Sequence, residues 1–446
     1  MAAQTEEIHR YNNPTTIVKM SKIIVLHPDL GLGGAERLIV DASKALQDSG
    51  HNVTIYTGYH DPRRCFRETC DNSLRVNVIG KRIPRAICGK FHALLAYIKM
   101  IYIAFYIVLF SQVDYHLVLC DQVAACIPVF KLVQIFKPYI RIVFYCHFPD
   151  QLLTGRESFI KNLYRKPIDF FEEWSTSLAD KIVVNSNFTG TVVRQTFTSF
   201  RNRQLYVLHP CVSVETLSSS KPSLADCGNH VKECIKRIAN VEKSFTFLSL
   251  NRFERKKDLE LAIQAMQVLQ LKLDNIAGES DKVKDPKQVF LLMAGGYDKR
   301  LSDSVEYYNE LVNMVADDEA LRDQVMFIKS PDENEKLILL RHCGAVIYTP
   351  KDEHFGIVPL EAMALSKPVI ASRSGGPLET VETEGQYASG KLCDHDSESF
   401  ADAMLQLCQD RKLSDKLGRN GLKRVQKLFS YESFQERLNK ICFEAT

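Results

Sequence analysis

The sequence predicts an α/β protein made of two doubly wound, Rossmann-like domains that face each other across a cleft. Short apolar runs alternate with longer helix-like stretches along most of the chain, which is typical of parallel strands joined by crossover helices. The length of 446 residues suits two domains better than one. Residues 213–243 lose the alternation and gather Ser, Lys, Pro and Asp, so we expect a linker or an exposed insertion there.

Each half of the chain has its own set of predicted strands. We expect an N-terminal domain over about residues 20–212, a C-terminal domain over about 244–415, and a helical segment at 416–446 that packs back on the N-terminal domain. Ligands bind at the carboxyl ends of parallel strands, so the cleft between the domains is the expected site. The predicted strands are 23–27, 53–56, 117–120, 142–146, 182–185 and 206–209, then 245–250, 289–294, 325–328, 345–348 and 369–371.

The composition is that of an ordinary globular chain. A net charge of +3 gives no general reason to expect nucleic acid as a partner. The 13 cysteines form no CxxC pairs and several lie in apolar runs, which favours a reducing compartment. Residues 1–22 lack the apolar core of a signal peptide, so we expect the chain on the cytosolic side of a membrane. The glycosylation sequons at Asn52 and Asn187 are then chance matches.

A glycine-rich turn, HPDLGLGGAER at residues 27–37, follows the first predicted strand. Gly33 and Gly34 allow close approach of a ligand, and the free amides of the next helix favour an anion, so this turn is a candidate diphosphate site. A plain tight turn is the alternative. Glu36 stands where a GxGxxG fingerprint has its last glycine, which disfavours binding of a nicotinamide dinucleotide.

The first strand of the C-terminal domain is followed by NRFERKKD, residues 251–258. It puts Arg252 and Lys257 at a strand-to-helix junction. The planar fork of an arginine and the point charge of a lysine suit a leaving diphosphate, whose charge must be stabilised. A solvated charged turn is the alternative.

The most informative motif is EHFGIVPLEAM, residues 353–363. Its proline fits the first turn of a helix, so the amides of Ile357 and Val358 are expected to be free and to face the cleft. Glu353 precedes this turn and Glu361 lies within it. Carboxylates on both sides suit a nucleotide sugar, which carries hydroxyls at both ends. A capping Glu361 and a surface Glu353 are the alternative.

Together these motifs resemble those of retaining GT-B glycosyltransferases of family four. The resemblance rests on the glycine-rich turn, on Arg252 with Lys257, on the two glutamates and on SGGP at residues 374–377. More narrowly, the chain resembles the alpha-1,3/1,6-mannosyltransferases of asparagine-linked glycan assembly over about residues 22–440. This narrower resemblance is carried by HPDLGLGGAERL, CDQVAACIPVF, FYCHFPDQLLT, LYRKPIDFFEEW, VNSNFT, AGGYD and EHFGIVPLEAM.

The resemblance implies a function. The donor would be GDP-mannose, and the acceptor a dolichyl-diphosphate chitobiose with one mannose, extended by an alpha-1,3 and then an alpha-1,6 mannose. The enzyme would associate with the cytosolic face of the endoplasmic reticulum membrane without spanning it, need no obligatory cofactor, and have other glycosyltransferases of the same pathway as candidate partners.

The resemblance also implies roles for residues. Arg252 and Lys257 would bind the donor diphosphate, Glu353 the mannose and Glu361 the ribose, while Gly33 and Gly34 would approach the acceptor or donor diphosphate. His147, in CHFPD, matches a cleft histidine of the family; by sequence alone a histidine at a strand end is as often structural. The implied catalytic set is Glu353, Lys257, Arg252 and His147, and the implied donor-binding set is Arg252, Lys257, Gly295, Glu353, His354, Phe355, Gly356, Ile357, Val358 and Glu361.

Retention of the alpha linkage implies either front-face attack or double displacement, and the resemblance favours the former. A phosphate oxygen would take the acceptor proton, with Arg252 and Lys257 stabilising the leaving diphosphate. No DxD pair follows a predicted strand, and Asp317-Asp318 lies in a polar helical stretch. We therefore expect that a metal is not obligatory.

Residues 91–110 are long and apolar enough to span a bilayer, with basic residues before them. Spanning is rejected, because Gly33 and His147 flank this segment and must share one cleft. We expect a helix that lies in the membrane surface, and a buried helix is the alternative. The expected lipid-facing stripe is Ile101, Phe105 and Leu109, and the basic residues are Lys81, Arg82, Arg85 and Lys90.

Three other functions remain as alternatives. One is a family-four glycosyltransferase with another nucleotide sugar or lipid acceptor. A GT-B phosphorylase would need a lysine-bound pyridoxal phosphate, which absorbance would reveal. A membrane-bound scaffold with a relict nucleotide site would have lost its charge complementarity, and the presence of Arg252, Lys257, Glu353 and Glu361 opposes it.

Overall fold

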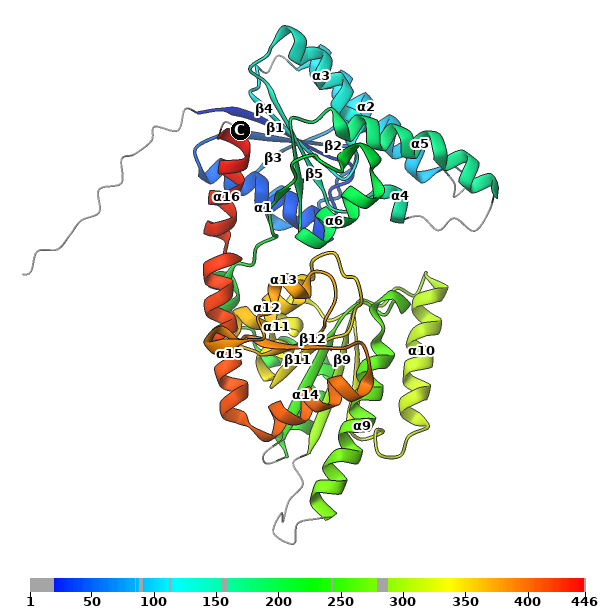
Figure 1. Ribbon diagram of the computed structural model, residues 1–446, viewed down its shortest axis with the longest axis vertical. Helices are drawn as coiled ribbons and strands as arrows, with labels where there is room; N and C mark the ends of the chain where they lie inside the picture. Colours follow the sequence, from blue (N-terminus) through cyan, green and yellow to red (C-terminus); the bar gives the residue numbers. More distant parts are fainter. Residues whose placement is uncertain are drawn as a thin grey trace, which may run out of the picture.

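The computed structural model describes residues 20–84, 86–87, 91–111, 114–153, 159–241, 244–278 and 288–444. Two α/β domains lie one above the other along its longest axis (Figure 1). Each has one sheet whose first strand lies near the middle, with the orders β3-β2-β1-β4-β5-β6-β7 and β10-β9-β8-β11-β12-β13. The pairings between these strands are parallel. The predicted fold class, two doubly wound domains, is confirmed.

The sheet of the N-terminal domain contains one strand that the sequence pattern did not predict. This strand, β3, lies at the sheet edge, and its residues are exposed or half-buried, so it has no continuous apolar run. The strands are β1 (Lys22–His27), β2 (Asn52–Thr57), β3 (Arg75–Val78), β4 (Leu117–Asp121), β5 (Arg141–Cys146), β6 (Lys181–Val184) and β7 (Tyr206–Val207).

Helices cover both faces of this sheet. Four of them, α2, α3, α5 and α6, pack on one face, while α1 and the C-terminal helix α16 pack on the other (Figure 1). Phe434, Leu438 and Cys442 of α16 are buried in the same apolar core as Val25 of β1. The helices are α1 (Gly34–Asp48), α2 (His92–Phe110), α3 (Ile127–Phe136), α4 (Asp150–Leu153), α5 (Phe159–Ser177), α6 (Asn187–Thr196) and α16 (Tyr431–Phe443).

Helix α2 has one buried face and one exposed face. In the described part of the chain it is the one helix long and apolar enough to cross a membrane, and 39% of its apolar window is buried. Met100, Ile103 and Ile107 belong to the core. Of the expected lipid-facing stripe, Phe105 and Leu109 are exposed, whereas Ile101 packs partly against the core. Among the basic residues expected beside it, Lys81 and Arg82 are exposed, and Arg85 and Lys90 lie outside the described residues.

The sheet of the C-terminal domain also gains an unpredicted edge strand, β13. Helices α9, α10 and α14 cover one face of this sheet, and α8, α11 and α12 cover the other. The strands are β8 (Phe245–Leu250), β9 (Val289–Gly295), β10 (Val325–Lys329), β11 (Ala345–Tyr348), β12 (Val369–Ser372) and β13 (Gly390–Cys393). The helices are α7 (Val214–Ser219), α8 (Asn229–Ala239), α9 (Leu259–Gly278), α10 (Ser302–Ala316), α11 (Glu333–His342), α12 (Ile357–Ala364), α13 (Pro377–Thr380), α14 (Ser397–Gln409) and α15 (Arg411–Leu428).

The segment 213–243 differs from the expected linker or insertion. It contains α7 and α8, and Val231, Cys234 and Ile235 of α8 are buried in the core of the C-terminal domain. Their spacing is that of one helical face, a period that a search for strands alone overlooks. Most of the segment is therefore part of the C-terminal domain. Short 3₁₀ turns complete the fold: η1 (Arg67–Thr69), η2 (Ala124–Cys126), η3 (Thr198–Phe200), η4 (Leu224–Asp226), η5 (Arg255–Lys257) and η6 (Gly385–Tyr387).

The two domains are in contact with each other. Glu379 of α13 accepts hydrogen bonds from the amides of Asn187 and Phe188, at 3.0 Å each, and lies 3.0 Å from Nε2 of His209. The Ser186 hydroxyl donates to the carbonyl of His354 at 2.6 Å. Because the Asn187 side chain also donates to Glu379 at 2.9 Å, this sequon residue takes part in the contact between the domains.

Candidate active site

The carboxyl ends of β8 and β11 bring Lys257 and Glu353 together. Lys257 ends the turn η5 after β8, and Glu353 follows β11. Nζ of Lys257 contacts the carboxylate of Glu353. The side chain of Lys257 is 12% exposed and that of Glu353 is 19% exposed. The hydroxyl of Thr349 donates to the backbone carbonyl of Lys257 at 2.8 Å, which ties the two strand ends together. Two residues far apart in sequence thus form one half-buried ion pair.

Electrostatics keep Glu353 charged. Burial alone would raise the pKa of this carboxyl, but the Lys257 charge and hydrogen bond, helped by a hydrogen bond from Tyr348, hold the pKa below its ordinary value. Burial, followed by the charge of Glu353, raises the pKa of Tyr348 well above its ordinary value. The tyrosine therefore stays neutral and donates its O–H to the carboxylate.

Helix α12 presents free backbone amides next to this pair. It begins at Ile357, so the amides of Ile357 and Val358 have no intrahelical acceptor. Gly356 precedes it with φ of 79°, and a Cβ there would meet the Tyr348 ring at 3.0 Å. A side chain is therefore disfavoured at Gly356 both by its backbone conformation and by its contacts. The helix N-terminus is suited to an anion.

Glu361 lies in α12 with one carboxylate oxygen engaged. Its Oε1 accepts from Nζ of Lys336 on α11 at 2.6 Å. Its Oε2 is buried and has no hydrogen-bond partner among the described residues. Burial raises the pKa of Glu361, and the Lys336 charge opposes that rise. A buried acceptor oxygen without a partner suits a ligand hydroxyl. Sequence reasoning missed Lys336, because its place on α11 gives no sign that this helix lies beside α12.

The SGGP turn supports the loop that carries Glu353. The amide of Gly376 donates to the Glu353 carbonyl at 2.8 Å, and a Cβ at Gly376 would overlap the Phe355 backbone. Gly375 has φ of 63° and leaves no room beside the Glu353 backbone. Glycines are required at this turn so that the two backbones can touch.

The other residues implied to bind the donor lie in different environments, some exposed and some buried. Arg252 is exposed and pairs with Glu254 at 2.8 Å. A Cβ at Gly295 would overlap the Asn251 carbonyl, so this glycine lets the end of β9 lie against the backbone before Arg252. The Phe355 ring is buried in the core of the C-terminal domain, so only its backbone can face a ligand. The His354 ring stacks on Phe148 of the N-terminal domain with centroids 3.7 Å apart.

The N-terminal-domain side contributes His147 and the glycine-rich turn. Nε2 of His147 lies 3.0 Å from Oδ2 of Asp121, a fully buried residue at the end of β4 that sequence reasoning missed. The space beside Gly34 is open, whereas a Cβ at Gly33 would overlap the carboxylate of Glu36. Gly33 has extended backbone, with φ of −172°. The glutamate carboxylate thus already occupies part of the space at the start of α1.

Two observations concern metals and thiols in the described part of the chain. No group of three or more His, Cys, Asp or Glu side chains there is arranged to hold a metal ion. The cysteines described are free thiols, and most of them are buried.

Two facing Rossmann-like domains, with a helix N-terminus and an ion pair at the cleft, define a GT-B glycosyltransferase. Residues 32–216 match the family model described as Glycosyltransferase Family 4, and residues 231–424 match the model described as Glycosyl transferases group 1. The chain belongs to the family of alpha-1,3/1,6-mannosyltransferases. The predicted family and enzyme class are confirmed.

The relatives that support this assignment match almost end to end. An alpha-1,3/1,6-mannosyltransferase ALG2 of Dictyostelium discoideum is 43% identical, over 95% of this chain and 98% of the relative. The protein of the same name from Homo sapiens is 42% identical, over 94% and 95%. A sucrose-phosphate synthase from Thermosynechococcus elongatus has a similar structure, with a TM-score of 0.68 at 21% identity over 94% of this chain and 98% of that one. This structural likeness supports the fold alone.

Proposed function

We propose that this chain transfers mannose, with retention of the alpha linkage, from GDP-mannose to a dolichyl-diphosphate oligosaccharide. In this proposal an alpha-1,3 and then an alpha-1,6 mannose are added to a chitobiose that already carries one mannose. The names of the relatives support the two linkages. The observation that carries the proposal is the Lys257–Glu353 ion pair beside the free amides of α12.

In this proposal the donor lies along α12, with a separate group for each of its parts. The buried Oε2 of Glu361 is available to a ribose hydroxyl. The amides of Ile357 and Val358, together with Arg252 and Lys257, are available to the diphosphate. Glu353, which is ionised and therefore only accepts hydrogen bonds, suits the hydroxyls of mannose. Binding the donor would divide the charge of Lys257 between the diphosphate and Glu353.

The reaction needs no protein nucleophile. The acceptor hydroxyl attacks the anomeric carbon on the face from which the diphosphate leaves. The bond between this carbon and the phosphate oxygen breaks, and a phosphate oxygen takes the hydroxyl proton. Lys257, Arg252 and the amides of α12 stabilise the charge that develops on the diphosphate. This chemistry does not assign an obligatory role to a metal.

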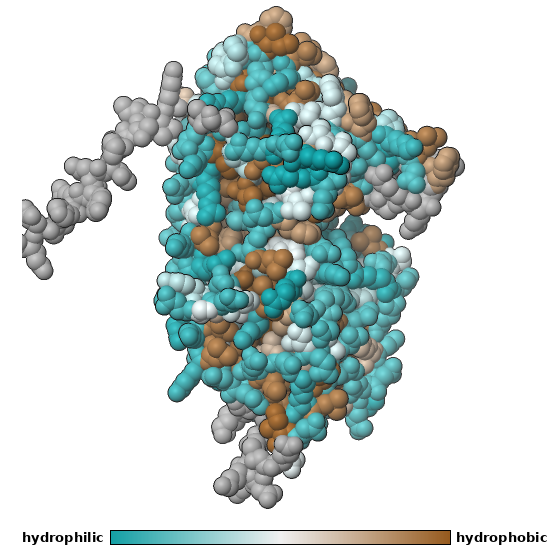
Figure 2. Space-filling model, viewed as in Figure 1, coloured by the Kyte–Doolittle hydropathy of each residue, from teal (hydrophilic) through white to brown (hydrophobic). Residues whose placement is uncertain are grey.

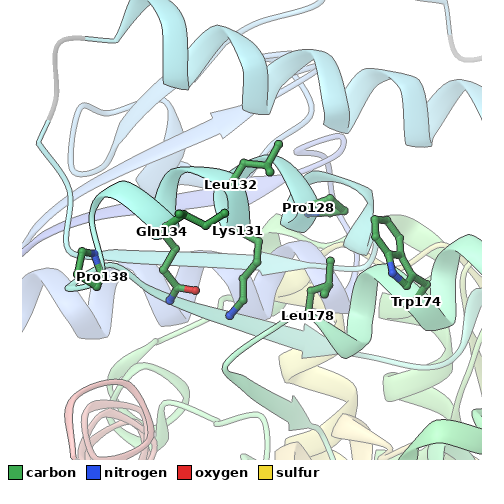
Figure 3. Close-up of a pocket in the computed structure, with 8 residues that line it drawn as sticks. Pro128, Lys131, Leu132, Gln134, Pro138, Trp174 and Leu178 are labelled. Carbon is green, nitrogen blue, oxygen red and sulfur yellow. The ribbon is translucent and has the colours of Figure 1, made fainter.

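The lipid acceptor calls for a membrane-facing surface, and the N-terminal domain has a suitable one. Large apolar side chains are exposed on α2, α3 and α5, and apolar residues gather at the top of this domain and at the projecting end of α5 (Figure 2). An apolar groove runs between α3 and α5, with Pro138 at one end and Pro128 and Trp174 facing each other at the other (Figure 3). We propose that this face docks on the cytosolic surface of the endoplasmic reticulum membrane without spanning it. The exposed set is Leu94, Ile98, Tyr102, Phe105, Leu109, Phe110, Leu132, Ile135, Phe136, Phe159, Leu163, Phe170 and Trp174.

The proposal is tested with purified protein, a panel of nucleotide sugars and two isoprenyl-diphosphate acceptors, a disaccharide and a mannose-bearing trisaccharide. Mass spectrometry is expected to show two hexoses added to the trisaccharide from GDP-mannose, and none from UDP-glucose. Transfer from another donor would support a different family-four glycosyltransferase. No transfer from any donor, with a folded protein, would favour the scaffold.

A further inference from the structure

The carboxyl ends of β1, β4 and β5 bring two histidines onto one carboxylate. Oδ1 of Asp121 lies 2.8 Å from Nδ1 of His27, and Oδ2 lies 3.0 Å from Nε2 of His147. The side chains of His27 and Asp121 are fully buried, whereas that of His147 is 20% exposed. Asp121 therefore lies behind His147 as seen from solvent, and both carboxylate oxygens are engaged.

The charge of Asp121 decides which atoms carry hydrogens. Burial alone would raise the pKa of this carboxyl, but the charge of His27 and the hydrogen bonds from His147 and His27 hold the pKa below its ordinary value. An ionised carboxylate only accepts hydrogen bonds, so each histidine must donate to it. The hydrogen of a neutral His147 then resides on Nε2, and Nδ1 is left with a lone pair.

The surroundings fix the ring of His147 in place. Its centroid lies 4.7 Å from that of Tyr145, and its backbone carbonyl accepts from the Asn185 side chain at 3.2 Å. The next residue, Phe148, stacks on His354 of the opposite domain. Within the described part of the chain no hydrogen bond engages Nδ1 of His147. The nitrogen with the lone pair is thus available beside the contact between the domains.

We propose that Asp121 is a positioning residue that holds His147 in the tautomer with hydrogen on Nε2, so that Nδ1 accepts a hydrogen bond from a sugar hydroxyl in the cleft. The proposal rests on the glycosyl transfer proposed above and concerns how the same site orients its sugar. His27 engages the second oxygen of Asp121 and so fixes the plane of the carboxylate. A hydroxyl hydrogen bond of this kind orients the sugar ring relative to the acceptor.

The tautomer is measured directly by nitrogen NMR. Wild-type protein is labelled with ¹⁵N-histidine, and a His147→Asn variant identifies the signals of His147. The expected spectrum has a protonated Nε2 and an unprotonated Nδ1. A His147 with hydrogen on Nδ1, or one that averages between the two tautomers, would overturn the proposal. The tautomer of His147 does not depend on which sugar is transferred. A spectrum that overturns this proposal therefore leaves the proposed function standing, and a different donor sugar leaves the tautomer assignment standing.

Kinetics of Asp121→Asn test the consequence. The new amide can accept from one histidine but must donate to the other, so the hydrogen of His147 is no longer directed to Nε2. We expect kcat to fall about 100-fold, with a smaller change in the KM for the donor, because orientation is lost and the phosphate contacts remain. A wild-type kcat for Asp121→Asn would also overturn the proposal.

A neighbouring variant separates positioning from general destabilisation. Cys120→Ala removes a fully buried thiol from the same strand without touching either histidine. It is expected to lower Tm while leaving kcat and the His147 nitrogen signals as in the wild type. If Cys120→Ala lowers kcat as much as Asp121→Asn does, the effect of Asp121 is structural and the proposal fails. Should Asp121→Asn not fold, the wild-type spectrum still decides.

Discussion

Replacing Lys257 by alanine removes the cation on which the donor site is centred. The Nζ contacts Glu353, and only 12% of the side chain is exposed, so its charge is preorganised and little screened. Loss of one such donor typically costs about 100- to 1000-fold in turnover, or about 3–4 kcal/mol of transition-state stabilisation. We expect Lys257→Ala to lower kcat by this amount.

Lys257→Ala should also lower the free energy of unfolding, and the exposure of the ion pair limits the size of this loss. Breaking a fully buried ion pair costs about 3–5 kcal/mol. Both partners here keep some exposure, and Tyr348 still donates to Glu353, so we expect a loss of about 1–2 kcal/mol. The protein should therefore remain folded at 25 °C, with a lower Tm.

The assay compares Lys257→Ala with a matched neighbour. Lys256 is 66% exposed and pairs with Glu254 at 3.0 Å, away from Glu353. Initial rates of sugar transfer at saturating donor and thermal melts are recorded for both variants. Lys256→Ala should transfer sugar at close to the wild-type rate. Wild-type turnover in Lys257→Ala, or equal losses in the two variants, would refute the assignment of Lys257 to the diphosphate.

Three further predictions concern ribose binding, the contact between domains and the membrane face. Burial raises the pKa of Glu361, so the stability linked to this carboxyl is present below its unfolded pKa and is lost as the pH rises through the folded value. Glu361→Gln should raise the donor KM, and it should also lower Tm at pH 7.5 because the partly buried Lys336 loses its counter-charge. An unchanged donor KM would contradict the assignment of Glu361 to the ribose. Burial lowers the pKa of His354 to about 4, so as the pH falls from 6.5 to 4 the free energy of unfolding should decrease by up to about 3 kcal/mol, measured by urea unfolding. The decrease should be smaller for His354→Phe, and an equal decrease in both proteins would show that His354 is not the source of this pH dependence. Phe105 and Leu109 are 48% and 68% exposed, so changing both to Ser should reduce flotation with liposomes without unfolding the protein. Leu271 on the C-terminal domain is 65% exposed and serves as the control, because Leu271→Ser should float like the wild type. Normal flotation of the double variant would remove α2 from the membrane face.

Strands and helix starts could be predicted from the sequence where a residue pattern has a single physical cause. Fully buried parallel strands give apolar runs, and β8 and β9 were found in this way, whereas the edge strand β3 lacks such a run. The turn before α12 was found because a proline in the first helical turn and the preceding glycine mark a helix start. Helix α8 was missed because its composition resembles that of a linker, although its apolar residues share one face.

The residues that support the site were harder to predict. Asp121 follows an apolar strand, but its importance comes from His27 and His147, which lie on two other strands. Lys336 contacts Glu361 only because α11 packs beside α12. Such contacts depend on tertiary packing, for which spacing along the chain carries no signal. Motifs therefore located the residues expected to touch substrate, and the structure was needed to find those that hold them.

A crystal structure of the complex with GDP-mannose would show whether a nucleotide-diphosphate sugar binds along α12. We expect the ribose on Glu361, the diphosphate on the amides of Ile357 and Val358 with Lys257 in contact, and the mannose beside Glu353. A diphosphate bound away from α12, with the Lys257–Glu353 pair unchanged from the free protein, would contradict this expectation.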